Sequence, residues 1–196
     1  MAITYFHRIP FFIPWLFPKA TWKGHEQAIY LTFDDGPSAE HTLPIAQFLH
    51  QQNAPSTFFF LGEKAKQFPH IVEQVKALGH TVGFHANDHV NLRTLSSTWF
   101  QANTSPPEVL QDSYLFRAPY GKMTREQLHL LDKKFKVIQW SLMPGDFDAS
   151  LSYQKKLAQL HRAKNHDIVV LHDLPVTFQL LKDYFKSSPT HVFKSL

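Results

Sequence analysis

Short apolar runs alternate along the chain with longer stretches in which apolar residues recur every three or four positions. Apolar runs rich in β-branched and aromatic side chains are typical of strands, and the three-to-four spacing is typical of helices. We therefore predict strands at residues 28–33, 56–61, 81–84, 114–116, 136–140 and 168–171. Between them we predict helices at residues 43–52, 69–78, 124–131, 152–162 and 175–185. Residues 91–107 show no clear period.

This repetition of strand and helix predicts an α/β domain. The runs at residues 28–33 and 56–61 are continuous enough to be buried on both faces, as strands of parallel sheets are, and residues 168–171 form the plainest buried strand. Right-handed crossovers would then place helices outside the strands. Periodicity does not distinguish an open doubly wound sheet from a barrel. No repeat or linker interrupts the sequence, so we expect a single domain over residues 28–196.

Residues 1–27 are expected to form an N-terminal segment that packs onto this domain through Trp15, Leu16, Phe17 and Trp22. The apolar run at residues 11–17 is shorter than the roughly 20 residues that span a bilayer. It lacks the small-residue cleavage pattern of a signal peptide, so none is predicted. Contact of this run with a membrane interface is the alternative. The location of the protein is therefore open between the cytoplasm and the membrane periphery, with an extracytoplasmic substrate also compatible.

The composition narrows the chemistry. The chain has 196 residues, 43% of them hydrophobic, which suffices for a core without disulfides or a structural metal. Since the chain has no Cys, thiolate metal sites and cysteine nucleophiles are excluded, and any metal must be held by His and carboxylates. The net charge is +4 and the pI about 9.2. The Lys and Arg residues are spread along the chain, which argues against nucleic-acid binding. The oligomeric state leaves no trace in the sequence.

Polar residues capable of chemistry follow the predicted strands. In α/β folds, functional side chains gather at the carboxyl ends of strands. The candidates are Asp34 and Asp35 after the first strand, His85 after the third, Arg117 after the fourth, Asp146 beyond the fifth and His172 at the end of the last. Their shared position predicts a site at one edge of the sheet.

Each candidate also has a purely structural interpretation. With 13 His in the chain, a pair at the spacing of His85 and His89 arises by chance, although residues four apart on a helix could share one ion. Asp34 and Asp35 could simply form a turn with the Gly and Pro that follow. Adjacent buried carboxylates repel each other unless a cation lies nearby. Because consecutive strand residues point opposite ways, one carboxylate could bind an ion while the other faces a substrate water. Arg117, Asp146 and His172 could be a salt-bridge residue, a turn residue and a core histidine.

Read in order, five segments resemble the motif series of the polysaccharide deacetylase family. They are Thr32-Phe33-Asp34-Asp35-Gly36-Pro37, His85-Ala86-Asn87-Asp88-His89, Arg117-Ala118-Pro119-Tyr120-Gly121, residues 140–146 and Leu171-His172-Asp173. The resemblance implies a distorted barrel of the (β/α)7 type, with about seven parallel strands. It also implies a divalent metal, usually zinc, with cobalt, nickel, iron and manganese as other candidates. The activity implied is removal of acetyl groups from N-acetylated sugars such as peptidoglycan or chitin oligomers.

The same resemblance implies roles for individual residues. Asp35, His85 and His89 would hold the metal. Asp34 would be the general base, oriented by Arg117.

On the acid side, the resemblance implies that His172 donates a proton to the leaving amine and is oriented by Asp146. The backbone amide of Tyr120 would help to bind the oxyanion, and Phe147 would line the substrate groove. Such a base and acid on opposite sides of an amide suit hydrolysis, because an amine leaves readily only when protonated.

Three positions depart from the family pattern. Ala86 replaces a Ser or Thr, Met143 replaces a frequent Asp, and Phe147 replaces a Trp. We expect an active enzyme with altered or narrow substrate choice. The alternatives are a catalytically silent carbohydrate-binding or scaffold protein of the same fold, and a related metal hydrolase acting on another C–N bond or an acetyl ester.

Overall fold

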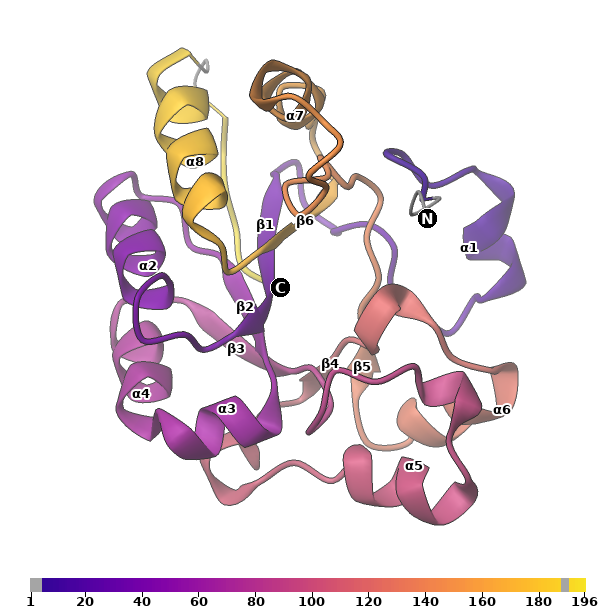
Figure 1. Ribbon diagram of the computed structural model, residues 1–196. Helices are drawn as coiled ribbons and strands as arrows, with labels where there is room; N and C mark the ends of the chain where they lie inside the picture. The colour runs from indigo at the N-terminus through magenta and orange to yellow at the C-terminus, as the bar shows by residue number, and fades with distance from the viewer. Residues whose placement is uncertain (1–4, 188–190) are drawn as a thin grey trace.

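The computed structural model describes residues 5–187 and 191–196, and its centre is a curled sheet of six parallel strands (Figure 1). The strands lie in the order β5-β4-β3-β2-β1-β6. Their bounds are β1 Tyr30–Gly36, β2 Thr57–Phe60, β3 Thr81–Phe84, β4 Leu115–Phe116, β5 Lys136–Val137 and β6 Ile168–His172. The α/β class and the distorted barrel are confirmed, with six paired strands rather than about seven.

Successive side chains of each strand point to opposite faces of the sheet, and this divides the core into two clusters. In β2, Phe58 and Phe60 pack with the larger cluster under the helices, while Phe59 points into the barrel. In β6, Val169 faces the helices and Val170 the interior. Both faces of the sheet are thus buried, which explains why these strands read as continuous apolar runs. Interior-facing positions at the strand ends point into the mouth of the barrel.

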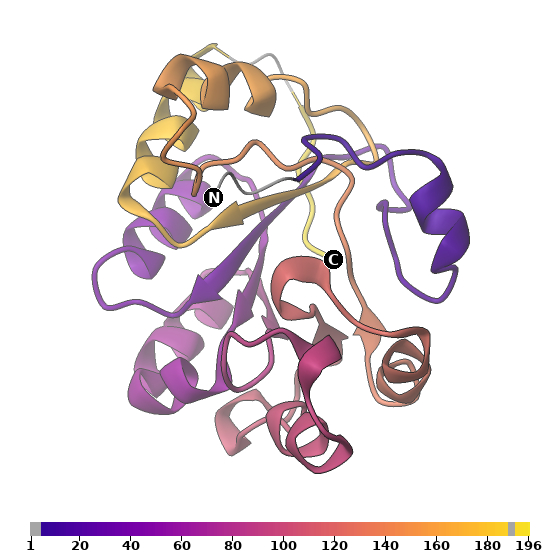
Figure 2. The same cartoon turned by 45° about the vertical axis from the view of Figure 1, so that its right-hand side comes forward.

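Helices cover the outside of the sheet (Figures 1 and 2). Their bounds are α1 Phe12–Leu16, α2 Thr42–Gln51, α3 Gly62–Gln67, α4 Pro69–Ala77, α5 Ser97–Asn103, α6 Arg125–Leu131, α7 Tyr153–Leu160 and α8 Pro175–Ser187, with short 3-10 turns η1 Leu92–Thr94, η2 Glu108–Leu110 and η3 Pro119–Gly121. All five predicted helices form, and α6 begins with the capping box of Thr124 and Gln127. The patternless residues 91–107 contain η1 and α5, which are too short to show a period. No described helix is long and apolar enough to cross a bilayer.

The barrel is completed by single backbone pairs rather than by a seventh strand. After β5 the chain crosses to β6, where Leu142 pairs with Val169. We call the stretch between β5 and β6 the seam. The N-terminal segment lines it, with Thr21 paired to Ile138 and Arg8 to Leu142. The edge between β5 and β6 is therefore covered although no regular strand closes it.

The N-terminal segment packs through fewer side chains than predicted. Phe17 and Trp22 lie against the core. Trp15 is 83% exposed and Leu16 also faces solvent, so the prediction that these two side chains pack onto the domain is wrong. The backbone is fastened to the seam on either side of α1, and the short helix projects outward between these points.

Candidate active site

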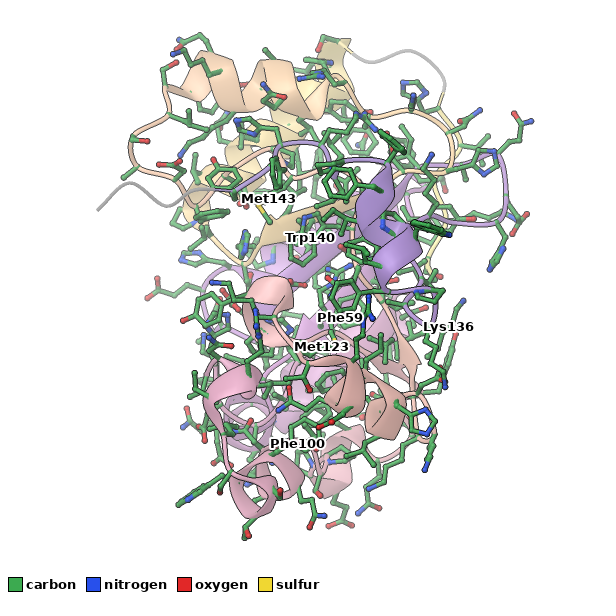
Figure 3. All side chains as sticks on the ribbon, turned by 90° about the vertical axis from the view of Figure 1, so that its right-hand side faces the viewer. Phe59, Phe100, Met123, Lys136, Trp140 and Met143 are labelled. Carbon is green, nitrogen blue, oxygen red and sulfur yellow. The ribbon has the colours of Figure 1, made fainter. Side chains whose placement is uncertain are left out.

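The predicted site residues come together at the carboxyl ends of the strands. A cavity of about 430 Å³ is lined by seven of the nine, namely Asp34, Asp35, His85, His89, Tyr120, Phe147 and His172. The other two, Arg117 and Asp146, are buried and each bonds to one of the lining residues. Trp140 and Met143, both labelled in Figure 3, also line the cavity.

Asp35, His85 and His89 form a compact cluster. One potential ligand atom from each lies within 4.8 Å of the other two. Asp35 Oδ1 is 3.4 Å from His85 Nε2 and 3.2 Å from His89 Nε2. This oxygen is buried and accepts no hydrogen bond from the described residues. A buried carboxylate oxygen without a donor, facing two imidazole nitrogens, suits a bound cation.

The two imidazoles are suited to offer lone pairs to such a cation. His85 Nδ1 lies 2.9 Å from the carbonyl oxygen of Arg117, which can only accept, so the ring proton is on Nδ1 and Nε2 faces Asp35. Burial lowers the pKa of His89, which favours its neutral form. Burial acts to raise the pKa of Asp35, but a hydrogen bond and positive charge from the adjacent imidazoles when they are protonated, His85 foremost, outweigh this effect and lower the pKa, so the carboxylate stays charged.

Asp34 and Asp35 lie on the same side of the strand end, contrary to the alternation that the sequence predicts. Asp34 Oδ2 is 3.9 Å from His85 Nε2, close to the position of Asp35. The pairing of β1 with β2 shifts register between Phe33 and Gly36, and Asp35 has the left-handed φ of 72°. This bulge turns the second carboxylate to the face of the first. The prediction that the two point opposite ways is therefore wrong.

A buried arginine holds Asp34 in place. Arg117 is fully buried, and its Nη1 donates to Asp34 Oδ1 at 2.7 Å and to Thr32 Oγ1 at 2.7 Å. Its guanidinium stacks on the Phe59 ring at 4.2 Å. Burial lowers the pKa of Arg117, and the Asp34 carboxylate opposes this effect. One carboxylate oxygen is thereby fixed by a cation, and the other faces the cavity.

His172 and Asp146 form a second pair across the cavity. His172 Nδ1 is 2.9 Å from Asp146 Oδ1, and the His172 backbone N–H donates to Asp146 Oδ2 at 2.7 Å. Thr177 donates to the same oxygen. Burial acts to raise the pKa of Asp146, but His172 and the other donors outweigh it, so the pKa is lowered. Burial acts to lower the pKa of His172. The negative charge of Asp146 outweighs it and raises the pKa of His172 to about 9. Proton donation at neutral pH suits such a group.

Tyr120 and Phe147 border these charged groups. The Tyr120 ring lies 4.4 Å from that of His89, and the Phe147 ring 4.8 Å from that of His172. Tyr120 has a left-handed φ of 58° within η3. Within the described residues, its backbone N–H donates to no protein acceptor, which leaves that group available to a ligand.

One wall of the cavity comes from outside the predicted motifs. Tyr5, in the N-terminal segment, lines the cavity with its ring 5.2 Å from that of Phe147 and its hydroxyl donating to Asp148 Oδ2 at 3.0 Å. Gly145 makes this approach feasible, because a Cβ there would lie 2.3 Å from the Tyr5 hydroxyl. Tyr5 lies 142 residues from Phe147 and 143 residues from Asp148 in sequence, so no local pattern could have revealed these contacts.

The loop between the two histidines is braced without a hydroxyl at position 86. Asn103 Oδ1 accepts the backbone N–H groups of Asn87 and Asp88, at 3.0 and 3.1 Å. The Asn87 side chain donates in turn to the carbonyls of Ala102 and Ser105. Asn87 stands between the histidines and was visible in the motif, whereas Asn103 lies in the stretch without a period and gave no signal.

The other ligand loop is fastened from two sides. Lys64 Nζ donates to the Asp35 carbonyl at 2.7 Å. Asp173 accepts bonds from the Ser38 N–H and the Thr42 hydroxyl, and so ties the loop after β1 to the end of β6. A Cβ at Gly36 would lie 2.8 Å from Asp173 Oδ2, so this close approach requires glycine.

Known proteins share this sequence pattern and architecture. Residues 22–134 match the family described as Polysaccharide deacetylase. A chitooligosaccharide deacetylase of Azorhizobium caulinodans is 31% identical over 157 residues, covering 76% of this chain and 75% of that protein. A peptidoglycan-N-acetylglucosamine deacetylase of Bacillus cereus is 35% identical over 126 residues, covering 61% of this chain and 46% of that protein. The chain thus spans about half the length of the second relative.

Solved structures agree in fold. A peptidoglycan N-acetylglucosamine deacetylase in complex with a naphthalenyl N-hydroxybenzamide has a TM-score of 0.83 at 26% identity, covering 96% of this chain and 95% of its own. A CE4 family pseudoenzyme from Bacillus anthracis has a TM-score of 0.75 at 19% identity, covering 89% of this chain and 66% of its own. With the family match extending over more than half of the sequence, this chain belongs to the polysaccharide deacetylase family.

Proposed function

We propose that the protein is a metal-dependent N-deacetylase that hydrolyses the acetamide of an N-acetylated sugar in a peptidoglycan-type or chitin-type oligosaccharide. The observation that carries this proposal is the buried Asp35 oxygen without a hydrogen-bond donor, set between two imidazole nitrogens. The base and acid candidates lie at the same cavity. The names of the relatives support the substrate class.

The residues present fit a divalent metal ion. Asp35, His85 and His89 would hold it, and a set of two nitrogens and one oxygen is typical of catalytic zinc sites; cobalt, nickel, iron and manganese accept similar donors. When bound, the ion would supply positive charge that polarises the acetyl carbonyl and makes water a better nucleophile.

Asp34 is the proposed general base. Its Oδ1 is held by Arg117, so Oδ2 remains to accept a proton from the water that attacks the acetyl carbon. The bond from Arg117 fixes the direction of this oxygen, and positioning of this kind is a large part of general base catalysis. Arg117 acts through Asp34 and is a positioning residue.

His172 is the proposed general acid. Collapse of the tetrahedral intermediate breaks the C–N bond, and the sugar amine leaves after accepting the proton of His172 Nε2. Asp146 binds Nδ1 and directs Nε2 toward the cavity. The backbone N–H of Tyr120 would donate to the carbonyl oxygen as it becomes an oxyanion.

The apolar wall of the cavity suits a sugar ring. Phe147, Tyr5 and Trp140 present aromatic faces to a space of about 430 Å³. Trp140 Nε1 is buried without an acceptor among the described residues. Aromatic faces with a few polar groups are typical of sites that bind small ligands with fixed orientation.

The proposal is tested by metal content and acetate release. The purified protein should bind about one zinc ion and release acetate from N-acetylglucosamine oligomers. Asp35→Ala should lose both the metal and the activity. Asp34→Asn should keep the metal and lose at least about 100-fold in kcat, because an amide cannot accept the proton. Full activity of the metal-free protein, or wild-type turnover by Asp34→Asn, would contradict the assignments.

A silent carbohydrate-binding protein is the second candidate, because a pseudoenzyme shares the fold. The retained pairs of Asp34 with Arg117 and of His172 with Asp146 argue against it, since sugar binding alone needs neither. Oligosaccharide binding without acetate release would favour the silent protein. Side-by-side assays on chitin oligomers, peptidoglycan fragments and acetyl esters would identify a hydrolase of another specificity.

A further inference from the structure

Large apolar side chains gather on the surface of the N-terminal segment. We define the aromatic patch as the exposed side chains Phe6, Phe11, Phe12, Trp15 and Leu16. Phe11 is 92% exposed and Trp15 83% exposed. Figures 1 and 2 place α1, which carries three of these residues, at the outer edge of the molecule, on the side opposite α2 and α4. Such a concentration of exposed rings marks an interaction surface.

The backbone that carries the patch is fixed at both ends. Before α1, Arg8 forms a bidentate ion pair with Asp167 at 2.9 and 3.0 Å, and the Ile9 N–H donates to the Ser141 carbonyl. After α1, the Thr21 N–H donates to the Val137 carbonyl. The exposure of Phe11, Phe12, Trp15 and Leu16, which lie between these fastenings, is therefore a property of the fold and does not come from a frayed end.

Basic side chains flank the patch on two sides. A hollow next to Phe11 is lined by Lys23 and Lys164, and by Arg8, whose charge is paired with Asp167. Another, next to Ile13 of α1, is lined by Arg93 and Lys122. In the part of the chain that the structure describes, no acidic side chain lines either hollow. Aromatic and aliphatic side chains bordered by cations match the interface of a bilayer that carries anionic lipids.

We propose that the aromatic patch docks the protein on an anionic phospholipid surface, with the flanking basic side chains against the headgroups. Lys122 lines both the second hollow and the site cavity, so the docking face adjoins the mouth of the site. The docked protein would hold its site close to the lipid surface. This inference does not depend on the reaction proposed above.

The arrangement of the rings favours lipid over a glycan strand. The rings of Phe11 and Phe12 are 5.9 Å apart and nearly perpendicular, at 88°. Stacking of successive sugars needs rings that offer a continuous flat face, which these two do not form. Insertion among acyl chains and headgroups requires apolar area without such alignment.

Vesicle co-sedimentation of the full chain tests the proposal. We expect binding to vesicles of equal parts phosphatidylcholine and phosphatidylglycerol, weaker binding to phosphatidylcholine alone, and a decrease with added salt. The double variant Phe11→Ser, Trp15→Ser should bind at least about tenfold more weakly, because it loses the most exposed rings. The control Trp99→Ser removes another exposed aromatic ring, 69% exposed, on α5 and should bind as the wild type does.

Further measurements separate the outcomes. Acetate release from soluble oligomers should be unchanged in the double variant, because the patch lies outside the cavity lining. Lys23→Gln with Lys164→Gln should weaken binding to the anionic vesicles specifically. Failure of the wild type to bind anionic vesicles, or equal binding by the double variant, would overturn the proposal. Binding to insoluble chitin or peptidoglycan that the double variant loses, without vesicle binding, would assign the patch to glycans instead.

Discussion

At the residue scale, three non-glycine residues of the site have left-handed backbone conformations. They are Asp35, Ala86 and Tyr120, with φ of 72°, 64° and 58°. Each such conformation costs about 1–3 kcal/mol, and persists only where the surroundings enforce it. Lys64 holds the carbonyl of Asp35, and the Gly62 N–H holds that of Ala86. The strain thus aims the site groups before any ligand arrives.

The raised pKa of His172 predicts the alkaline limit of activity. Because the pKa of His172 is raised to about 9, the ring keeps its proton as the pH rises past the ordinary histidine pKa, and the proposed acid is lost only at higher pH. The alkaline limb of the kcat/KM profile should lie at or below about pH 9, since a cation on Asp35 would offset part of the rise in the pKa of His172. Asp146→Asn should move this limb toward lower pH.

The measurement is a pH profile of kcat/KM between pH 6 and pH 10. Asp183→Asn, which alters a half-buried carboxylate of α8 outside the cavity, is the matched control and should leave the limb in place. An alkaline limb that stays unmoved in Asp146→Asn would reject His172 as the acid directed by Asp146.

At the scale of elements, the loop between the metal-ligand candidates depends on α5. Asn103, at the end of α5, accepts two N–H groups from the loop that carries His89. The residue at position 86 has no hydroxyl, so the amide of a distant helix takes over the support. The loop of the candidate metal ligands thus keeps a backbone support despite the departure at Ala86.

Asn103→Ala should lower zinc affinity by about 10–100-fold, because it frees the loop while leaving all three candidate ligands intact. Competition with a chromophoric chelator measures this affinity. Asn165→Ala, at an exposed asparagine that bonds to Gln27, is the control and should bind zinc normally. Unchanged affinity in Asn103→Ala would show that the loop keeps its shape without this support.

At the scale of the whole molecule, the N-terminal segment takes part in the barrel. It pairs along the seam beside β5 and β6, supplies Tyr5 to the cavity wall, and carries the aromatic patch outside. Its fastening to β6 runs through Arg8 and Asp167, whose carboxylate is almost fully buried.

Arg8→Ala should lower the free energy of unfolding by about 1–3 kcal/mol, because it leaves a buried carboxylate without its cation. Urea denaturation measures the change. Lys19→Ala removes an exposed ion pair with Asp132 and should cost less than about 1 kcal/mol. Equal losses in the two variants would show that the Arg8 pair has no special weight.

The sequence by itself determined the order of the six strands and of the five helices α2, α4, α6, α7 and α8, but not the short helices α1, α3 and α5, and it supplied the residue types of the candidate site. Strand runs such as residues 81–84 and the capping box at Thr124 are local signals, set by side-chain periodicity and by bonds between near neighbours. The five motifs added the family, because their order is a property of the chain alone.

The tertiary structure decided what no local pattern encodes. It turned Asp35 to the side of Asp34 through a bulge, left Trp15 in solvent, and brought Tyr5 and Asn103 to the site from distant segments. These outcomes depend on contacts between residues far apart in sequence. The physical reason is that burial and hydrogen bonding are satisfied over the whole fold, whereas periodicity reports only on the nearest turns of the chain.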